Sequence, residues 1–214
     1  ITQELVRRTQ GFYAAKVIGL NGLGHAAVAK LWPDVVPSDK CKWERAKTAV
    51  VKMCPAMPRI EQRVLVREVA TLADYAKNTL LTETEEDLRK AMVRSGATSV
   101  SGPERLLEIT QLVLAMSKTH TGQIDFADQI WLPHVLGLQP RVAENIVIDE
   151  AQDLNDAQIA LVRKAVLPGG RVTAVADDRQ CLYRFRGAAA DVFSRVVNPQ
   201  ASFLLPISYR LPRA

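Results

Sequence analysis

The residues best suited to chemistry are two adjacent acids, Asp149 and Glu150, at the end of a short apolar run. Such a run, bounded by polar residues, predicts a buried strand at Asn145–Asp149. At the carboxyl edge of a parallel sheet, where α/β proteins bind ligands, one carboxylate could hold Mg²⁺ through its water shell. The other could orient and deprotonate a water that attacks a phosphate. The alternative for an isolated Asp-Glu pair is an acidic helix start, which the helix dipole favours.

A second group of candidate residues follows the strand predicted at Arg171–Ala176. The amide of Gln180 lies just past the strand end and could report on a terminal phosphate. Tyr183 and Phe185 offer rings on which bases can stack, and Arg186 offers a guanidinium for a phosphate or a ring. The alternative is a strand and turn whose aromatic side chains pack into the core.

A third candidate is the pair Tyr209 and Arg210, which follows the strand predicted at Phe203–Leu205. The planar, permanently charged fork of an arginine suits the charge that spreads over a phosphoryl group during transfer. A Tyr-Arg dipeptide alone indicates no function. The interpretation of Tyr209 and Arg210 as candidate functional residues depends on their position in the sequence after the first two groups.

Near the N-terminus, the sequence VIGLNGLGH predicts a strand at Lys16–Gly19, then a glycine-rich turn and a helix. Glycine backbone lets a phosphate approach closely, and Asn21 and His25 could donate hydrogen bonds to it. The alternative is a structural turn with a capping asparagine and a satisfied histidine.

These segments together resemble superfamily 1 DNA helicases of the UvrD/Rep family. DEAQD at residues 149–153 resembles the family's Walker B motif, and residues 177–188 resemble its coupling motif, GDxxQxIYxFRGA. SYR at residues 208–210 and NGLGH at residues 21–25 resemble a Tyr-Arg motif and a DNA-contacting motif, and IDFAD at residues 124–128 resembles a structural re-entry segment. Ala176 and Cys181 depart from the family's usual Gly and Ser, but both residues are small.

The resemblance implies ATP and Mg²⁺ as cofactors and assigns roles around one nucleotide. Asp149 would hold Mg²⁺ through water, and Glu150 would be the general base. Gln180 would sense the γ-phosphate, Tyr209 would stack on the adenine, and Arg210 would contact the γ-phosphate. The catalytic set is therefore Glu150, Gln180 and Arg210.

The resemblance also implies single-stranded DNA and duplex junctions as partners. The DNA-binding residues would be Asn21, His25, Tyr183, Phe185 and Arg186. The net charge of +5 is concentrated in residues 1–70, where Lys and Arg outnumber Asp and Glu twelve to six. Such an excess suits a polyanion, although solvated helix faces are often basic as well.

The expected fold class is α/β, a RecA-like P-loop NTPase core with a mostly parallel sheet and an all-helical insertion subdomain. Strands alternate with helices near both ends, whereas helical patterns dominate between them. We expect residues 1–32 to begin the core (domain 1A), residues 33–120 to form the insertion (domain 1B), and residues 121–214 to complete the core. Prolines at positions 33, 37, 55 and 58 punctuate the start of the insertion.

Three helices can be placed in more detail. The repeat of Ile60, Val64, Leu65, Leu72, Ala76 and Leu80 predicts one amphipathic helix over Ile60–Leu81. A second helix is predicted from Pro103 to about Lys118, with Ser101 as its cap. A third is predicted from Asn155, as its cap, to about Leu167, before Pro168-Gly169-Gly170.

The phosphate-binding pattern GxxxxGK[ST] does not occur in the sequence. By the resemblance, this loop and the second motor domain would lie elsewhere in one parent chain, so we expect a fragment that alone turns over little or no ATP. The parent would be an ATP-dependent DNA helicase of repair or replication type, moving 3′ to 5′ on single strands and unwinding duplexes. The alternatives are the motor of a helicase–nuclease or phage recombination protein, and a non-catalytic single-strand-binding module.

The remaining composition excludes several classes. No run of about 18 uncharged apolar residues and no signal-peptide layout occurs, so we expect no membrane partner and a cytoplasmic protein of bacterial or phage origin. Cys41, Cys54 and Cys181 form no CxxC pair and are odd in number. They indicate buried or incidental thiols rather than a disulfide framework or a zinc site.

Overall fold

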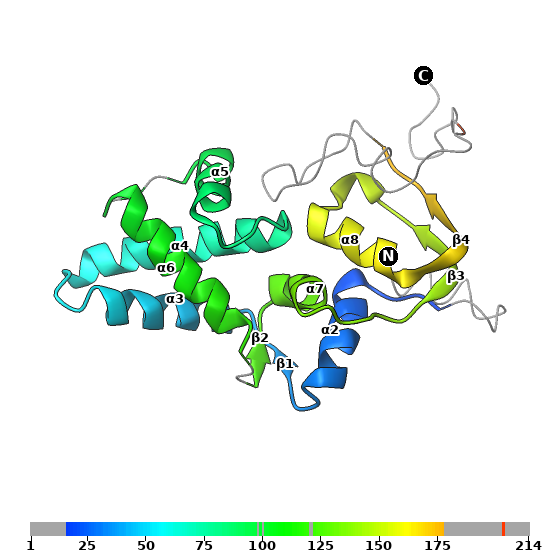
Figure 1. The fold of residues 1–214 in the computed structure, drawn as a ribbon, viewed down its shortest axis with the longest axis horizontal. Coiled ribbons are helices and arrows are strands. Elements are labelled where there is room, and N and C mark those ends of the chain that lie inside the picture. Colours follow the sequence, from blue (N-terminus) through cyan, green and yellow to red (C-terminus); the bar gives the residue numbers. More distant parts are fainter. Residues whose placement is uncertain (1–15, 98, 100, 120–121, 178–202, 204–214) are drawn as a thin grey trace, which may run out of the picture.

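The computed structural model describes residues 16–97, 99, 101–119, 122–177 and 203. Figure 1 shows α3, α4, α5 and α6 gathered at one end, β3, β4 and α8 at the other, and α7 and α2 between them. The elements in chain order are α2 (Leu20–Leu31), β1 (Val36–Pro37), α3 (Lys40–Met53), α4 (Arg59–Asn78), α5 (Glu85–Ser95), α6 (Pro103–Ser117), β2 (Gln123–Ile124), α7 (Phe126–Val135), β3 (Ala143–Ile148), the 3₁₀ turn η1 (Ala151–Asp153), α8 (Asp156–Ala165) and β4 (Val166–Ala174).

The predicted helix at residues 60–81 is confirmed as α4, but two of its predicted core positions are wrong. Ile60 is 73% exposed and Val64 is 40% exposed. The buried stripe of α4 contains Leu65 and Leu72, and each residue turns the helix by about 100°. Ile60 and Val64 therefore point about 140° and about 100° away from Leu65, toward solvent.

The helix starts were predicted with mixed success. Pro103 begins α6 as expected, but the cap is Gly102 rather than Ser101. The backbone of Gly102 has φ of 88°, which glycine adopts far more readily than serine. Asn155 caps α8 as predicted, in a reciprocal capping box with Gln158.

The acids follow a parallel pair of strands, as predicted. β3 pairs with β4 in parallel, with Ile146 opposite Val172 and Ile148 opposite Ala174. β4 begins at Val166, earlier than expected, and includes Pro168-Gly169-Gly170. A register shift between the pairs of Ala143 and Asn145 accommodates these extra residues.

The expectation that this strand is buried is wrong for most of β3. Ile148 is buried, whereas Val147 is 74% exposed. Successive side chains of a strand point to opposite faces. Ile148 and the partly buried Ile146 pack in one cluster with Ile159 and Val162 of α8, which covers that face of the strand.

The prediction of a strand at Lys16–Gly19 is wrong. These residues form no strand, and α2 begins at Leu20. Gly22 and Gly24 consequently lie inside a helix and not in a turn. The strand predicted at residues 203–205 lies outside the described residues apart from Phe203, which is exposed and in no strand. The described fold is thus mixed α/β with short parallel strand pairs, and the proposed domain boundaries stay predictions.

A second parallel pair joins the two ends of the helical stretch. Val36 of β1 lies opposite Gln123 of β2, and Pro37 lies opposite Ile124. The chain therefore leaves for α3 and returns from α6 at neighbouring positions, as Figure 1 shows. Between these points, α3, α4, α5 and α6 share one hydrophobic core that also includes Trp131 and Leu132 of α7.

Helix α7 also packs closely against α2. A Cβ atom added to Gly24 would lie 2.0 Å from the carbonyl oxygen of Gln129. Leu23, Ile130 and Leu161 fill the adjoining core between α2, α7 and α8. Gly24 is therefore required by the close approach of two helix backbones.

Four buried charges attach α7 to the helical end of the molecule. Lys77 Nζ lies 2.8 Å from Asp125 Oδ2 and 2.6 Å from Asp128 Oδ1. Arg45 forms a buried ion pair with Asp128 and donates from Nη2 to the carbonyl of Gln123 at 2.7 Å. Asp125 and Asp128 also form the capping box of α7, so the same carboxylates start the helix and bind both cations.

The electrostatics of this buried ion cluster follow from its pairing. Burial alone would lower the pKa of Lys77, but the two carboxylates outweigh it and hold that pKa above its ordinary value. Burial alone would raise the pKa of Asp125, but Lys77, the Asp128 N–H and Arg45 together outweigh it and lower that pKa. Cys41 and both acids lie close enough to share a metal ion, but Lys77 and Arg45 already bind the carboxylates.

Two other expectations concern thiols and membranes. Cys41 and Cys54 are free and buried, as predicted, and Cys181 lies outside the described residues. Burial raises the pKa of the Cys41 thiol to about 11. Within the described part of the chain, no helix combines the length and the apolar character needed to cross a membrane.

The two glycines of α2 make a matched pair for testing the packing with α7. Gly24→Ala should lower the free energy of unfolding by about 1–3 kcal/mol, because the new methyl group meets the Gln129 carbonyl. Gly22→Ala should raise it by about 0.5–1 kcal/mol, because alanine is the better helix former and its Cβ meets only Ile18, at 3.6 Å. Urea denaturation measures the free energy of unfolding of both variants. Equal changes in the two variants would contradict the close approach of α2 and α7.

The buried ion cluster is tested by removing one cation. Lys77→Met should lower the free energy of unfolding by about 3–5 kcal/mol, because it leaves two buried carboxylates with only Arg45. Lys90→Met, which removes an exposed lysine paired with Glu86 on α5, serves as the control and should leave the thermal midpoint unchanged. Similar midpoints for the two variants would show that Lys77 is not a partner of both acids.

Candidate functional site

Asp149 and Glu150 directly follow the carboxyl end of β3, beside the end of β4. The backbone pairing continues past both strands: the Val175 N–H donates to the Ile148 carbonyl at 2.8 Å, and the Ala151 N–H donates to the Val175 carbonyl at 2.9 Å. The two acids are thus held between hydrogen-bonded neighbours. Their position at a strand end agrees with the sequence analysis, and their chemical roles remain predictions.

The backbone of Glu150 has an unusual conformation. Its φ of 53° and ψ of 42° place it in the left-handed region, which non-glycine residues adopt at a cost of roughly 1–2 kcal/mol. Such conformations persist where surrounding contacts enforce them, and they are concentrated at functional sites. Glu150 is flanked here by two backbone hydrogen bonds, from the Val175 N–H to the Ile148 carbonyl and from the Ala151 N–H to the Val175 carbonyl.

Gln152 is a site residue that the sequence analysis did not single out. Its side chain is almost fully buried, with the residue 4% exposed. Its Nε2 donates to Glu150 Oε2 at 2.6 Å, and its Oε1 accepts from the Asp177 N–H at 3.1 Å. The available signal was its place two residues after Glu150 in DEAQD, but the partner at Asp177 is not evident from sequence.

The carboxylates themselves are accessible. Asp149 and Glu150 are both exposed, and Asp149 Oδ1 accepts the Glu150 N–H at 3.1 Å. Mg²⁺ keeps several of its waters and needs only one or two carboxylates from a protein. An exposed acid at a strand end therefore fits a water-mediated Mg²⁺ site better than the buried group of Cys41, Asp125 and Asp128 does.

Six other candidate residues belong to the nucleotide and coupling groups. They lie outside the described residues: Gln180, Tyr183, Phe185, Arg186, Tyr209 and Arg210. Asp177 precedes Gln180 by three positions, and its N–H donates to Gln152 at the acidic edge. The predicted gathering of these side chains around one nucleotide stays a prediction.

Asn21 and His25 lie on α2, one helical turn apart and so on one face. One N–H of the Asn21 amide donates to the carbonyl of Phe126 at 2.8 Å, which ties the start of α2 to the start of α7. Nδ1 of His25 is buried and has no hydrogen-bond partner. The alternative of a satisfied histidine is therefore not supported at that nitrogen, and the DNA-contacting role stays a prediction.

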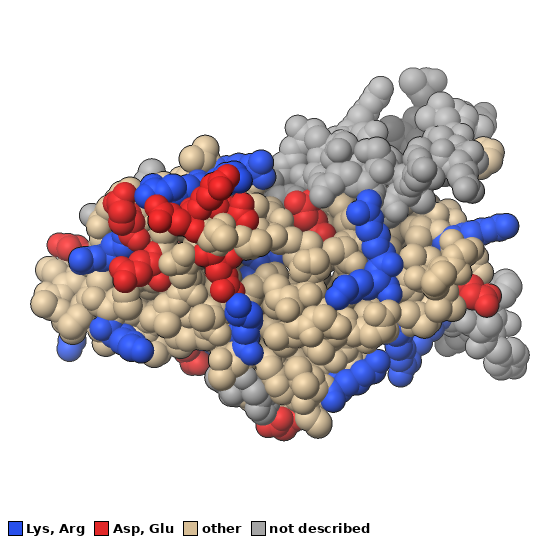
Figure 2. All heavy atoms as spheres, viewed as in Figure 1, with Lys and Arg blue, Asp and Glu red and all other residues tan. Residues whose placement is uncertain are grey.

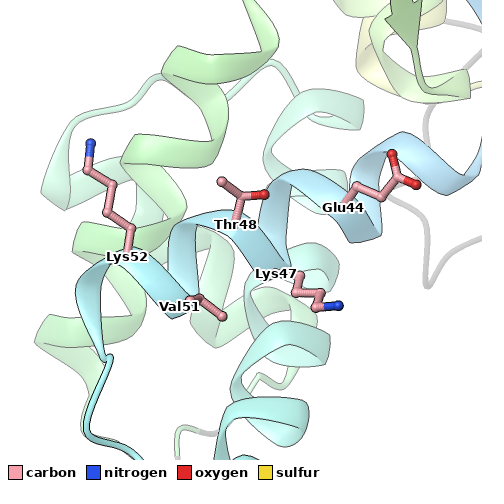
Figure 3. Close-up of a pocket in the computed structure, with 5 residues that line it drawn as sticks. All are labelled: Glu44, Lys47, Thr48, Val51 and Lys52. Carbon is pink, nitrogen blue, oxygen red and sulfur yellow. The ribbon is translucent and has the colours of Figure 1, made fainter.

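The surface elsewhere offers less chemistry. A shallow hollow on α3 is lined by Glu44, Lys47, Thr48, Val51 and Lys52, all from that one helix. Figure 3 shows Lys47 and Lys52 pointing away from each other, so their charges do not converge on a ligand. On the face in Figure 2, acidic side chains gather over α5, and the basic ones form no continuous surface.

Comparison with known proteins decides the family. The family model of the UvrD/REP helicase N-terminal domain matches residues 29–200, well over half of the chain. The chain belongs to the UvrD/REP helicase family. The match includes Asp149, Glu150 and Gln152, whereas Asn21 and Arg210 fall outside it.

Individual relatives agree with this assignment. DNA helicase II of Salmonella typhimurium is 38% identical over 85 residues, and DNA helicase II of Escherichia coli is 36% identical over 85 residues. Each alignment covers 36% of this chain and 12% of the relative. The resemblance drawn from the sequence motifs is confirmed at the level of the family.

The left-handed backbone of Glu150 is tested by two substitutions at that position. Glu150→Gly should be more stable than Glu150→Ala by about 1 kcal/mol, because only glycine adopts this conformation freely. At Thr71, an exposed position within α4, the order should reverse, with alanine more stable than glycine by about 1 kcal/mol. Chemical denaturation gives the free energy of unfolding of all four variants. A more stable alanine variant than glycine variant at position 150 would contradict the left-handed conformation.

Proposed function

We propose that this UvrD/REP family protein uses Mg²⁺-dependent ATP hydrolysis to move along single-stranded DNA and unwind duplexes. The observation that carries the proposal is the pair of accessible carboxylates at the carboxyl end of a parallel strand, with Glu150 held in an unusual backbone conformation. An acid pair at this edge suits hydrolysis of a phosphate bond. Family membership, with DNA helicases among the relatives, supports DNA as the substrate.

Asp149 would hold the metal. Its exposed carboxylate leaves room for a hydrated ion, and bound Mg²⁺ would neutralise charge on the β- and γ-phosphates. The Glu150 N–H donates to Asp149 Oδ1, so the backbone of the second acid orients the first. The two acids would therefore act as one preorganised unit.

Glu150 would orient and deprotonate the attacking water. A general base must be held within hydrogen-bond reach of the proton that it removes. The carboxylate of Glu150 is exposed on one side and accepts a hydrogen bond from Gln152 on the other. That arrangement leaves one oxygen free of this contact to accept the proton.

The remaining nucleotide contacts are proposed from the family motifs. Gln180 would sense the γ-phosphate, Tyr209 would stack on the adenine, and Arg210 would contact the γ-phosphate as charge develops. The Asp177 N–H donates to Gln152 at the acidic edge, and Asp177 precedes Gln180 by three positions in the sequence.

DNA would be bound by a different set of residues. Tyr183 and Phe185 would stack on bases, and Arg186 would contact a phosphate or a ring. Asn21 and His25 on α2 would contact the backbone of the single strand or of a junction. The family resemblance implies 3′-to-5′ movement and a second motor domain that closes on the same nucleotide.

The arrangement of the chain supports a RecA-like core interrupted by a helical insertion at residues 33–120. The β1–β2 pair brings the two ends of this stretch together, which is what an insertion into a core requires. The same stretch contains α3 to α6 and their shared core. We propose that it corresponds to domain 1B and that the flanking parts belong to domain 1A.

The proposal is tested by ATP hydrolysis in the full-length protein encoded by the gene that carries this sequence. Glu150→Gln should lower the DNA-stimulated kcat by about 100-fold or more, because it removes the base, while ATP affinity stays close to that of the wild type. Glu144→Gln, which removes an exposed glutamate at the other end of β3, is the matched control and should retain full turnover.

Two results would oppose the proposal. Full activity of Glu150→Gln would remove Glu150 from the reaction. A wild-type protein that binds single-stranded oligonucleotides but hydrolyses no ATP would instead favour a non-catalytic binding module.

A further inference from the structure

We infer that Gln152 is a positioning residue that links the Glu150 carboxylate to the chain following β4. The inference rests on the proposed role of Glu150 as general base. It adds a specific connection between two segments. A shift of the backbone at Asp177 would move the Glu150 carboxylate, and a nucleotide that displaces this carboxylate would in turn shift the backbone at Asp177.

The connection is made by a single amide with both ends engaged. Nε2 of Gln152 donates to Glu150 Oε2 at 2.6 Å, and Oε1 of Gln152 accepts from the Asp177 N–H at 3.1 Å. The amide presents a donor to one group and an acceptor to the other, whereas an ionised carboxylate lacks the donor and a lysine or arginine lacks the acceptor. The side chain of Gln152 therefore matches both of the groups that it joins.

The amide of Gln152 is buried, whereas both of its partners belong to exposed residues. Gln152 is 4% exposed, which limits the access of water to its amide. The hydrogen bond to Glu150 is assisted by the negative charge of the carboxylate and is correspondingly stronger than a neutral one. Losing it would free the Glu150 side chain to sample other rotamers.

The backbone around the amide is fixed independently. Val175 exchanges hydrogen bonds with Ile148 and Ala151, and these bonds hold the two strand ends whatever residue stands at position 152. Replacing Gln152 should therefore leave the strand pair intact. What changes is the tie between Glu150 and Asp177.

The test is steady-state ATP hydrolysis by the full-length protein with saturating single-stranded DNA. Gln152→Met keeps the volume of the buried side chain and removes both hydrogen bonds. It should lower kcat about tenfold or more while KM for ATP changes less than about twofold, because the base is misplaced but nucleotide binding is not. Gln129→Met replaces another buried glutamine, on α7, and should leave both constants unchanged.

A second variant separates the two hydrogen bonds. Gln152→Glu keeps an acceptor for the Asp177 N–H but replaces the donor with a like charge beside Glu150. It should lose kcat at least as strongly as Gln152→Met. Thermal unfolding of each variant establishes that the loss occurs in folded protein.

A double-mutant cycle distinguishes positioning from general support of the fold. If Gln152 acts through Glu150, adding Gln152→Met to Glu150→Gln should cause no further loss of kcat. A further loss of tenfold in the double variant would overturn the inference. So would a folded Gln152→Met protein with wild-type kcat, or unfolding of both Gln152 variants, which would leave Gln152 a structural role only.

Failure of the proposed function has a different signature. If Glu150→Gln itself retains full turnover, the base assignment fails and the inference falls with it. If Glu150→Gln is inactive while Gln152→Met and Gln152→Glu are fully active, the base assignment stands and only the link through Gln152 is wrong.

Discussion

The parallel pairing of β3 with β4 is the constraint on which the acidic edge depends. The Val175 N–H donates to the Ile148 carbonyl and the Val175 carbonyl accepts from the Ala151 N–H, which continues the pairing beyond both strands. Asp149 and Glu150 lie between these bonds, and Glu150 has a left-handed conformation. Gln152 then uses its amide to join Glu150 to Asp177. Two segments that are separate in sequence, residues 148–152 and 175–177, thus form one edge, and the proposed attack on a phosphate requires side chains positioned in this way.

A second set of interactions fixes how the helical end meets this edge. Lys77 and Arg45 pair with Asp125 and Asp128 at the start of α7, and Gly24 lets α2 lie directly against α7. The neighbouring Asn78 accepts a hydrogen bond of 2.9 Å from the side chain of Asn155, the cap of α8. The C-terminal end of α4 therefore contacts the N-terminal ends of both α7 and α8. Because removing one partner of a buried ion pair leaves an uncompensated charge, this junction is sensitive to the loss of any one of these four charged side chains.

Local patterns predicted much of this structure. Three elements follow from local patterns alone. An apolar run that ends in acids predicts β3, a proline in a first helical turn predicts α6, and an asparagine before an amphipathic run predicts α8. Other features depend on partners distant in sequence. Gly24 lies in α2, where the close approach of the Gln129 carbonyl leaves no room for a Cβ atom, and the pairing of Arg45 with Asp128 spans 83 positions. The role of Gln152 likewise required knowing that Asp177 lies beside it.

The central claim is that the acidic edge faces a nucleotide shared with the downstream glutamine and arginine. It is tested most directly by a crystal structure of the full-length protein with Mg²⁺ and a non-hydrolysable ATP analogue. The account predicts a hydrated Mg²⁺ beside Asp149, the Glu150 carboxylate facing the γ-phosphate, and Gln180 and Arg210 around the same phosphate. A nucleotide bound elsewhere, with Asp149 and Glu150 turned to open solvent, would contradict it.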